Sequence, residues 1–418
     1  MEPKSSSTLA PLPEENQNQD EDEDHPPKTT APSAFSSKPI RPPTQSVPKF
    51  HTPSFSSILC FSHDYYYVQA FWDFDTITVH FLFRCTLFSC RTSSEKYSPL
   101  DWKGYFDQED DVCIPDTNDV FHIYTAGKEG PVVFCLHGGG YSGYFATQKV
   151  KSVVLQTIPR LSFAISARLI KEKARVVAMD LRGHGKSSTE NEIDMSIETL
   201  CSDVVAVVKT MYGDSPPAIV LVGHSMGGSV AVHVAAKKVL RSLAGLVVVD
   251  VVEGTAMASL MHMQKILANR MQYFSTLEKA IEWNVRGGSL RNIESARISI
   301  PGTVKYDDSQ QCYCHRARLQ ETEQYWRGWY EGLSEKFLSS PVPKLLLLAG
   351  TDRLDRALTI GQMQGKFQMV VVRHTGHAIQ EDVPEEFASL VLNFIARNRI
   401  GPYGVEIPGI RQPSKPHG

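Results

Sequence analysis

Short apolar runs alternate with amphipathic stretches from about residue 97 to residue 400. The apolar runs predict strands at 120–125, 132–136, 175–179, 218–222, 246–249, 345–348 and 369–372. Apolar residues at helical spacing predict helices at 200–211, 229–240 and 384–397. Strands that are apolar along their whole length are buried on both faces. The alternation therefore predicts an α/β fold with a mostly parallel central sheet and helices on both faces.

Other parts of the chain do not follow this alternation. Residues 1–55 are rich in Pro, Ser, Gln and acidic residues, so we expect a disordered tail. Residues 56–96 are rich in aromatic residues, Cys and His, and their apolar positions follow neither a helical nor a strand period. They are either an extra strand pair or a non-native segment from a mis-spliced gene, and we favour the second. Within the main domain, 97–400, residues 253–338 are mostly helical in pattern, and we expect them to form a cap over the carboxyl ends of the strands. We expect 401–418 to be a C-terminal tail.

The most informative motif is Gly223-His-Ser225-Met-Gly227, which ends an apolar run and precedes a helix of small residues. A serine on such a sharp strand-to-helix turn forms a nucleophile elbow, and small residues two positions before and after it let the backbone cross closely. The motif alone is common. The strand before it and the helix after it favour a serine hydrolase with Ser225 as the nucleophile.

A serine nucleophile needs a base, and the base needs an acid that orients it. We predict His377 as the base, because it follows the last strand, comes after a glycine and precedes the final helix. His374 is its rival, although its position suits the end of the strand. His224 is too close to Ser225 along the backbone to act as its base, and we expect it to pack under the elbow.

The acid has several candidates that follow strands. They are Asp250, Asp352 and Asp355. The commoner arrangement in serine hydrolases takes the acid from the later loop, which favours Asp352 or Asp355, but sequence spacing alone leaves the choice open.

The developing oxyanion needs two backbone N–H groups. One is expected from Met226, the residue after the nucleophile. The other is expected from the His137-Gly-Gly-Gly140 loop, where Gly138 and Gly139 let the chain approach the oxyanion closely.

Composition limits the cellular compartment and the kinds of partner that we expect for this chain. The formal net charge of −3 gives no reason to expect a nucleic-acid partner or an anionic membrane surface. The N-terminus lacks the apolar segment of a signal peptide, and the apolar stretch 71–90 carries charged residues that are costly in a bilayer. The eight cysteines are scattered, so we expect reduced thiols in an intracellular protein of the cytoplasm, with the nucleus as a further location. Cys312-Tyr-Cys314-His315 lacks the second ligand pair of a zinc site, and we expect no metal.

Two longer motifs are more specific than the elbow: Asp250-Val-Val-Glu-Gly-Thr-Ala-Met257 and Gly361-Gln-Met-Gln-Gly-Lys-Phe-Gln-Met369. Over residues 97–400 the chain resembles the protein phosphatase methylesterase family, serine esterases of the α/β-hydrolase fold. The resemblance implies Asp250 as the acid, no organic cofactor and a helical cap. It also implies a substrate and partner. The family removes the methyl ester from the C-terminal leucine carboxylate of the type 2A protein phosphatase catalytic subunit.

One departure from the family pattern bears on activity. Residues 144–160 interrupt the resemblance directly after the oxyanion loop, and we predict an insert there. Such an insert either lengthens a surface loop without consequence or displaces 138–140 and lowers activity. Two alternative functions therefore stay open at this point: a general small-molecule serine carboxylesterase, and a catalytically weak regulator that binds the phosphatase.

Overall fold

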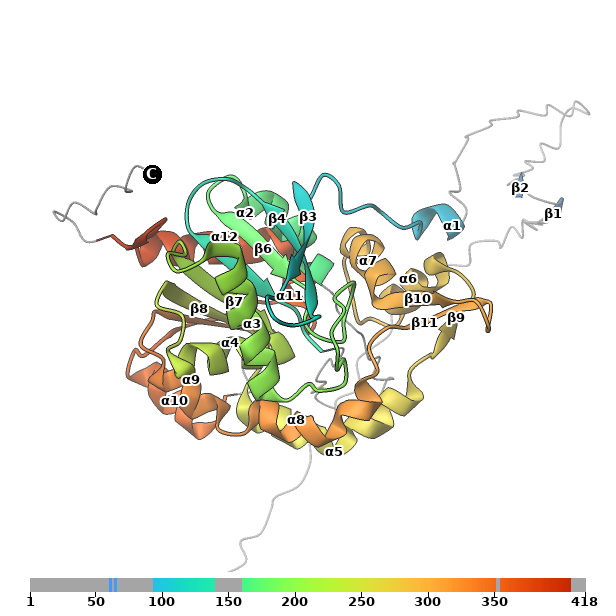
Figure 1. Ribbon diagram of the computed structural model, residues 1–418. Coiled ribbons are helices and arrows are strands. Elements are labelled where there is room, and N and C mark those ends of the chain that lie inside the picture. Colours follow the sequence, from blue (N-terminus) through green and yellow to red (C-terminus); the bar gives the residue numbers. More distant parts are fainter. Residues whose placement is uncertain (1–59, 62–63, 66–92, 140–159, 351–353, 407–418) are drawn as a thin grey trace, which may run out of the picture. The chain divides into compact units, whose positions relative to one another are not determined.

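The computed structural model describes residues 60–61, 64–65, 93–139, 160–350 and 354–406 (Figure 1). The chain divides into two units, Met1–Thr86 and Leu87–Gly418. In the first, β1 (Cys60–Phe61) pairs antiparallel with β2 (Asp64–Tyr65). The predicted tail 1–55, most of segment 56–96, nearly all of the insert 144–160 and the end of 401–418 lie outside the described residues.

An eight-stranded sheet forms the centre of the second unit, in the order β13-β12-β8-β7-β5-β6-β4-β3. The strands are β3 (Gln108–Cys113), β4 (Val120–Ala126), β5 (Val132–Leu136), β6 (Arg175–Met179), β7 (Ile219–His224), β8 (Leu243–Val249), β12 (Lys344–Leu348) and β13 (Gln368–Val371). Every pair from β13 to β6 is parallel, whereas β4 runs antiparallel to β6 and to β3. The mostly parallel sheet confirms the predicted fold class.

Helices cover both faces of this sheet. The helices α3 (Ile197–Tyr212) and α4 (Met226–Lys237) cover one face, and α2 (Ala164–Ile170) and α12 (Pro384–Arg397) cover the other (Figure 1). Successive residues of a strand point to opposite faces. Leu221 of β7 accordingly packs in the core beside α3 and α4, and Val222 packs in the core beside α12. Burial on both faces explains why β7 is apolar along most of its length.

The chain between β8 and β12 forms helices and a second, smaller sheet. The helices are α5 (Glu253–Asn269), α6 (Leu277–Arg286), α7 (Ile293–Ser299), the 3₁₀ turns η2 (Ile300–Thr303) and η3 (Leu319–Thr322), α8 (Glu323–Tyr330) and α9 (Leu333–Ser339). The antiparallel sheet, in the order β10-β11-β9, consists of β9 (Tyr273–Phe274), β10 (Val304–Asp307) and β11 (Cys312–His315). We call residues 253–339 the cap. Its sheet was not predicted, because strands of two and four residues carry too little pattern to be recognised.

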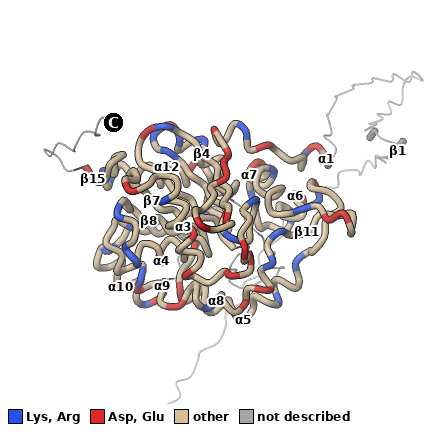
Figure 2. Tube along the Cα trace, viewed as in Figure 1, with Lys and Arg blue, Asp and Glu red and all other residues tan. Residues whose placement is uncertain are grey.

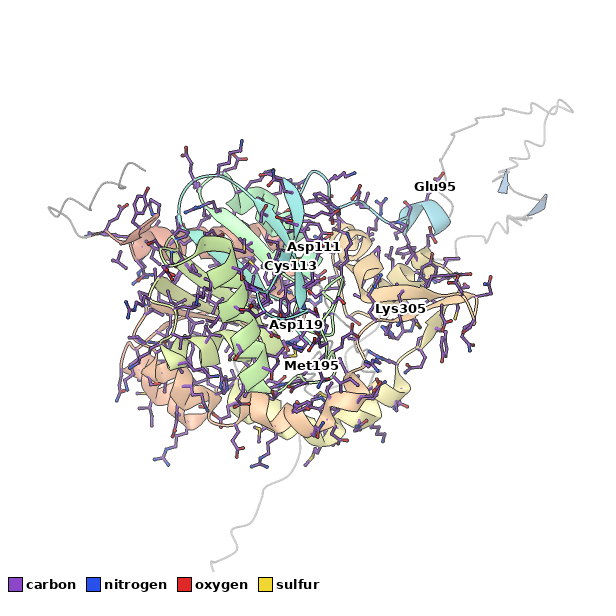
Figure 3. The ribbon with its side chains drawn as sticks, viewed as in Figure 1. Glu95, Asp111, Cys113, Asp119, Met195 and Lys305 are labelled. Atoms are coloured by element: carbon purple, nitrogen blue, oxygen red, sulfur yellow. The ribbon has the colours of Figure 1, made fainter. Side chains whose placement is uncertain are left out.

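Polar contacts connect the cap to the chain that follows β6, and connect that chain to α3 and to the residue before β4. The indole Nε1 of Trp329, on α8, donates to the carbonyl oxygen of Met195 at 2.7 Å. In the loop after β6, the guanidinium of Arg182 contacts Asp119 at 2.7 Å and Asp203 of α3 at 2.8 Å. Figure 3 labels Met195 and Asp119, which mark these two contacts. The loop that follows β6 is therefore fixed beside the cap.

The remaining elements are short. They are α1 (Ser93–Lys96), η1 (Arg160–Phe163), α10 (Arg356–Met363), α11 (Ile379–Asp382), β14 (Ile400–Gly401) and β15 (Gly404–Val405). Basic and acidic residues are both spread along the described trace (Figure 2). Among the described residues, no helix combines the length and the apolar character needed to cross a membrane.

Candidate active site

Ser225 lies on the turn between β7 and α4 with a positive backbone φ of 52°. A residue with a side chain adopts this conformation at a cost, and it persists where its surroundings fix it. Here the N–H of Ser225 donates to the carbonyl oxygen of Val249 at 3.0 Å. A Cβ at Gly223 would lie 2.2 Å from the carbonyl oxygen of Gly227, so the crossing needs glycine. The turn has the strained geometry of a nucleophile elbow.

His377 and Asp250 are in hydrogen-bond contact beside this turn. Nδ1 of His377 lies 2.7 Å from Oδ2 of Asp250, which directly follows β8. The other oxygen of Asp250 accepts the N–H of Ala349 at 2.8 Å, and the Asp250 side chain is fully buried. The carboxylate holds the proton on Nδ1, which leaves Nε2 as the atom that can accept one. Nε2 of His377 is buried and makes no hydrogen bond with any residue that the structure describes.

The rival acids lie elsewhere or are occupied. Oδ1 of Asp355 caps the N-terminus of α10 by accepting the N–H of Leu358 at 2.9 Å, and Oδ2 accepts the hydroxyl of Ser334. Asp355 therefore stabilises a helix end and a contact with α9. Asp352 falls outside the described residues. The structure thus brings Asp250 to His377, against the general preference for the later loop and in agreement with the family resemblance.

The rival histidines also have other surroundings. His374 is exposed and has a positive φ of 60°, beyond the end of β13. His224 is fully buried, and burial lowers the pKa of its imidazole to about 3, so the ring is neutral. Its Nε2 donates to the carbonyl oxygen of His377 at 2.9 Å. His224 therefore packs under the elbow and also holds the backbone of His377.

The loop after β5 packs against the elbow. A Cβ at Gly138 would lie 3.2 Å from Cβ of Ser225, and one at Gly139 would lie 2.6 Å from Sδ of Met226. Met226 is the first residue of α4, and the first N–H groups of a helix have no partner within it. Both predicted sources of oxyanion donors therefore adjoin the nucleophile. Gly140 lies outside the described residues.

His137 fixes the start of this loop. It is fully buried; Nδ1 donates to the carbonyl oxygen of Gly138 at 2.9 Å, and Nε2 accepts the N–H of Leu181 at 3.0 Å. These two bonds define a neutral imidazole, because one ring nitrogen donates and the other accepts. The histidine thus connects the glycine loop to the loop after β6.

Sequence reasoning missed one set of residues near His377. Gly376 donates its N–H to the side chain of Asp382 on α11 at 2.6 Å. The only signal was an acidic pair, Glu381-Asp382, shortly after the histidine. Such a pair is usually a solvated surface, and nothing in its sequence position indicated burial.

The described residues contain no group of three His, Cys, Asp or Glu side chains placed to hold a metal ion. Cys312 and Cys314, both on β11, are free thiols.

Comparisons with known proteins establish the family. The model of the alpha/beta hydrolase family matches residues 132–390. Protein phosphatase methylesterase 1 of Mus musculus is 42% identical over 362 residues, which cover 75% of this chain and 89% of the mouse protein. The chain belongs to the protein phosphatase methylesterase 1 family of α/β hydrolases. It is a carboxylic ester hydrolase, as the sequence predicted.

Relatives from other organisms agree. The probable protein phosphatase methylesterase 1 of Caenorhabditis elegans is 44% identical, with 75% of this chain and 82% of that protein covered. The Schizosaccharomyces pombe protein of the same family is 38% identical, with 72% and 85% covered. Among solved structures, an E-2-(acetamidomethylene)succinate hydrolase has a TM-score of 0.55 at 19% identity and covers 69% of this chain and 99% of its own. At that identity the likeness concerns the fold alone.

Proposed function

We propose that this esterase removes the methyl ester from the C-terminal leucine carboxylate of the type 2A protein phosphatase catalytic subunit. Relatives that carry the name protein phosphatase methylesterase 1 support a phosphatase substrate. The observation that carries the chemistry is the 2.7 Å contact between His377 Nδ1 and Asp250, which leaves the buried Nε2, with no hydrogen-bond partner among the described residues, as a proton acceptor.

In the first half of the reaction, Nε2 of His377 takes the proton of the Ser225 hydroxyl as the serine oxygen attacks the ester carbonyl. Asp250 stabilises the imidazolium that forms. The N–H groups of Met226 and of the Gly138–Gly139 loop would donate to the oxyanion. The bond to the methoxy group then breaks, and that group leaves as methanol with the proton from His377.

In the second half, His377 takes a proton from water, and the hydroxide attacks the acyl-serine. The ester bond to Ser225 breaks, the serine recovers its proton, and the leucine carboxylate is released. The two halves consume one water and yield one methanol and one carboxylic acid. The chain's own side chains and backbone supply every proton transfer, so the steps require no organic cofactor.

Replacement of the nucleophile tests the proposal. Ser225→Ala should reduce methanol release from a phosphatase with a methylated C-terminus by about 10⁴-fold or more, since removal of a nucleophilic serine abolishes the covalent route. The matched control is Ser229→Ala on the same helix. Ser229 is fully buried and its hydroxyl has no hydrogen-bond partner among the described residues, so we expect wild-type turnover.

Two outcomes would contradict the proposal. Faster cleavage of short aryl or alkyl esters than of the methylated phosphatase would indicate a general carboxylesterase. Tight phosphatase binding that survives Ser225→Ala, together with negligible turnover by the wild type, would indicate a binding regulator instead.

A further inference from the structure

The loop that carries His377 is held from two sides. It has no regular secondary structure and connects β13 to α11. On the inner side, His224 donates to the carbonyl oxygen of His377 at 2.9 Å. On the other side lies Asp382, the last residue of α11. These contacts act on the backbone of the loop, in addition to the bond between the imidazole and Asp250.

Asp382 accepts hydrogen bonds from the residues just before His377. Its Oδ2 accepts the N–H of Gly376 at 2.6 Å and lies 3.2 Å from the hydroxyl of Thr375. The side chain of Asp382 has no exposed surface. A buried carboxylate is costly unless donors surround it, so these contacts fix the loop and the carboxylate together.

The same carboxylate also contacts the cap. Its Oδ1 accepts the N–H of Arg291 at 2.7 Å, in the segment between α6 and α7, and the guanidinium of Arg291 lies 4.0 Å from Oδ2. One side chain therefore bonds to the loop of the catalytic base through one oxygen and to the cap through the other.

The neighbouring acid, Glu381, provides a natural comparison. It is also fully buried on α11, and its Oε2 accepts the hydroxyl of Ser299 on α7 at 2.6 Å. Its backbone carbonyl accepts the hydroxyl of Ser295 at 2.8 Å. Glu381 thus contacts the cap as Asp382 does, but its other oxygen, Oε1, has no hydrogen-bond partner among the described residues, so its side chain makes no hydrogen bond to the loop 374–377. The two acids lie on the same helix, their side chains have no exposed surface, and both bond to the cap.

We infer that Asp382 is a positioning residue for the hydrolysis. It keeps the loop of His377 in place relative to Ser225 and couples that loop to the cap through Arg291. The inference rests on the proposed role of His377 as the base. It assigns to Asp382 no contact with the substrate.

The test compares Asp382→Asn with Glu381→Gln in the full chain, with p-nitrophenyl acetate as the substrate. The single amide oxygen of Asn can accept only one of the two N–H groups, and its NH₂ group would face the other donor. A displacement of the base by a fraction of an ångström to 1 Å should lower kcat by about 10- to 100-fold. KM should stay within about twofold, because binding of so small an ester does not depend on the base. Glu381→Gln should retain wild-type kcat and KM.

A spectroscopic signature separates positioning from general packing. The proton shared by His377 Nδ1 and Asp250 should give a downfield resonance in the wild type and in Glu381→Gln. That resonance should shift or vanish in Asp382→Asn. Thr375→Val removes the hydroxyl that contacts the Asp382 carboxylate, and it should lower kcat by about fivefold. This variant provides the test if Asp382→Asn does not fold.

Wild-type kcat and an unshifted resonance in Asp382→Asn would overturn the inference. Equal losses in Asp382→Asn and Glu381→Gln would do so as well, because they would indicate packing of α11 alone. In the absence of folded Asp382→Asn, an unchanged kcat in Thr375→Val would have the same meaning. Each of these results leaves the proposed function intact, because that function is tested separately by methanol release from the methylated phosphatase in the wild type and in Ser225→Ala.

Discussion

At the scale of single residues, backbone strain marks the site. Ser225 and Asp250, which directly follow β7 and β8, have positive φ angles of 52° and 51°. Non-glycine residues rarely hold this conformation, and it clusters where function needs a side chain in one direction. Hydrogen bonds fix both residues: the N–H of Ser225 donates to the carbonyl oxygen of Val249, and Oδ1 of Asp250 accepts the N–H of Ala349. The strained backbone and the hydrogen bonds that hold it together set the direction of the Ser225 and Asp250 side chains.

The choice of acid yields a prediction at this scale. Asp250→Asn should keep the contact with His377 but favour the wrong imidazole tautomer, and kcat should fall by about 10³- to 10⁴-fold, as in other serine triads. Asp355→Ala should leave kcat unchanged and cost about 1 kcal/mol of stability through the lost cap of α10. Ester hydrolysis and urea unfolding measure the two effects. A loss of activity in Asp355→Ala as large as that in Asp250→Asn would show that the acid is misassigned.

At the scale of elements, close approach between the elbow and the strand beside it shapes the site. The turn from β7 into α4 packs against the end of β5. A Cβ at Gly227 would lie 2.4 Å from the carbonyl oxygens of Leu136 and His137. These are backbone atoms, which cannot move away by a change of side-chain rotamer. Any side chain at this position would therefore force the backbone of the strand–turn–helix unit to shift.

Gly227→Ala should accordingly destabilise the protein by about 1–3 kcal/mol, because the added methyl group must push the start of α4 away from the end of β5. Gly328→Ala is the control within a helix. A Cβ there would meet no atom within 4 Å, and α8 needs no positive φ at that position. This variant should be about 0.5–1 kcal/mol more stable than the wild type. Urea unfolding of both variants checks the pair, and equal effects would rule out the steric argument.

At the scale of the whole second unit, the cap and the central sheet meet around a short buried helix. Glu381 and Asp382 of α11 both bond to cap residues, and α11 packs against α12 and α7. Burial raises the pKa of Glu381 to about 8, from an ordinary value of 4.5. The carboxyl is therefore mostly protonated in the folded protein at neutral pH, and Gln is a close mimic of it.

This shift predicts a pH dependence of stability. Above pH 4.5 the unfolded chain releases a proton that folded Glu381 retains up to about pH 8. The contribution of Glu381 to the free energy of unfolding is thus complete below pH 4.5 and decreases as pH rises through about 8. Glu381→Gln has no such proton, so its stability relative to the wild type should increase between pH 5 and pH 8. Urea unfolding at both values measures the change, and parallel pH profiles would contradict it.

Much of the fold was predictable because buried parallel strands carry a strong signal. The predicted bounds of β5, β6 and α12 coincide with those observed. The edge strand β3 was missed, since five of its six residues are exposed and three of them are charged. The helix after Ser225 begins at Met226, three residues earlier than predicted. Glycine disfavours a helix, so Gly227 and Gly228 hid its start, although close packing at both positions favours glycine there.

The sequence by itself determined the family, the nucleophile motif, the candidate histidine and the glycine loop, because each depends on residue types at short spacing along the chain. Tertiary structure alone decided which carboxylate meets that histidine. Asp250 and His377 are 127 residues apart, and they touch because β8, β12 and β13 are neighbours in a parallel sheet whose carboxyl ends share one edge. It also revealed Asp382, whose contacts with the loop and the cap exist only after distant segments have packed and excluded water.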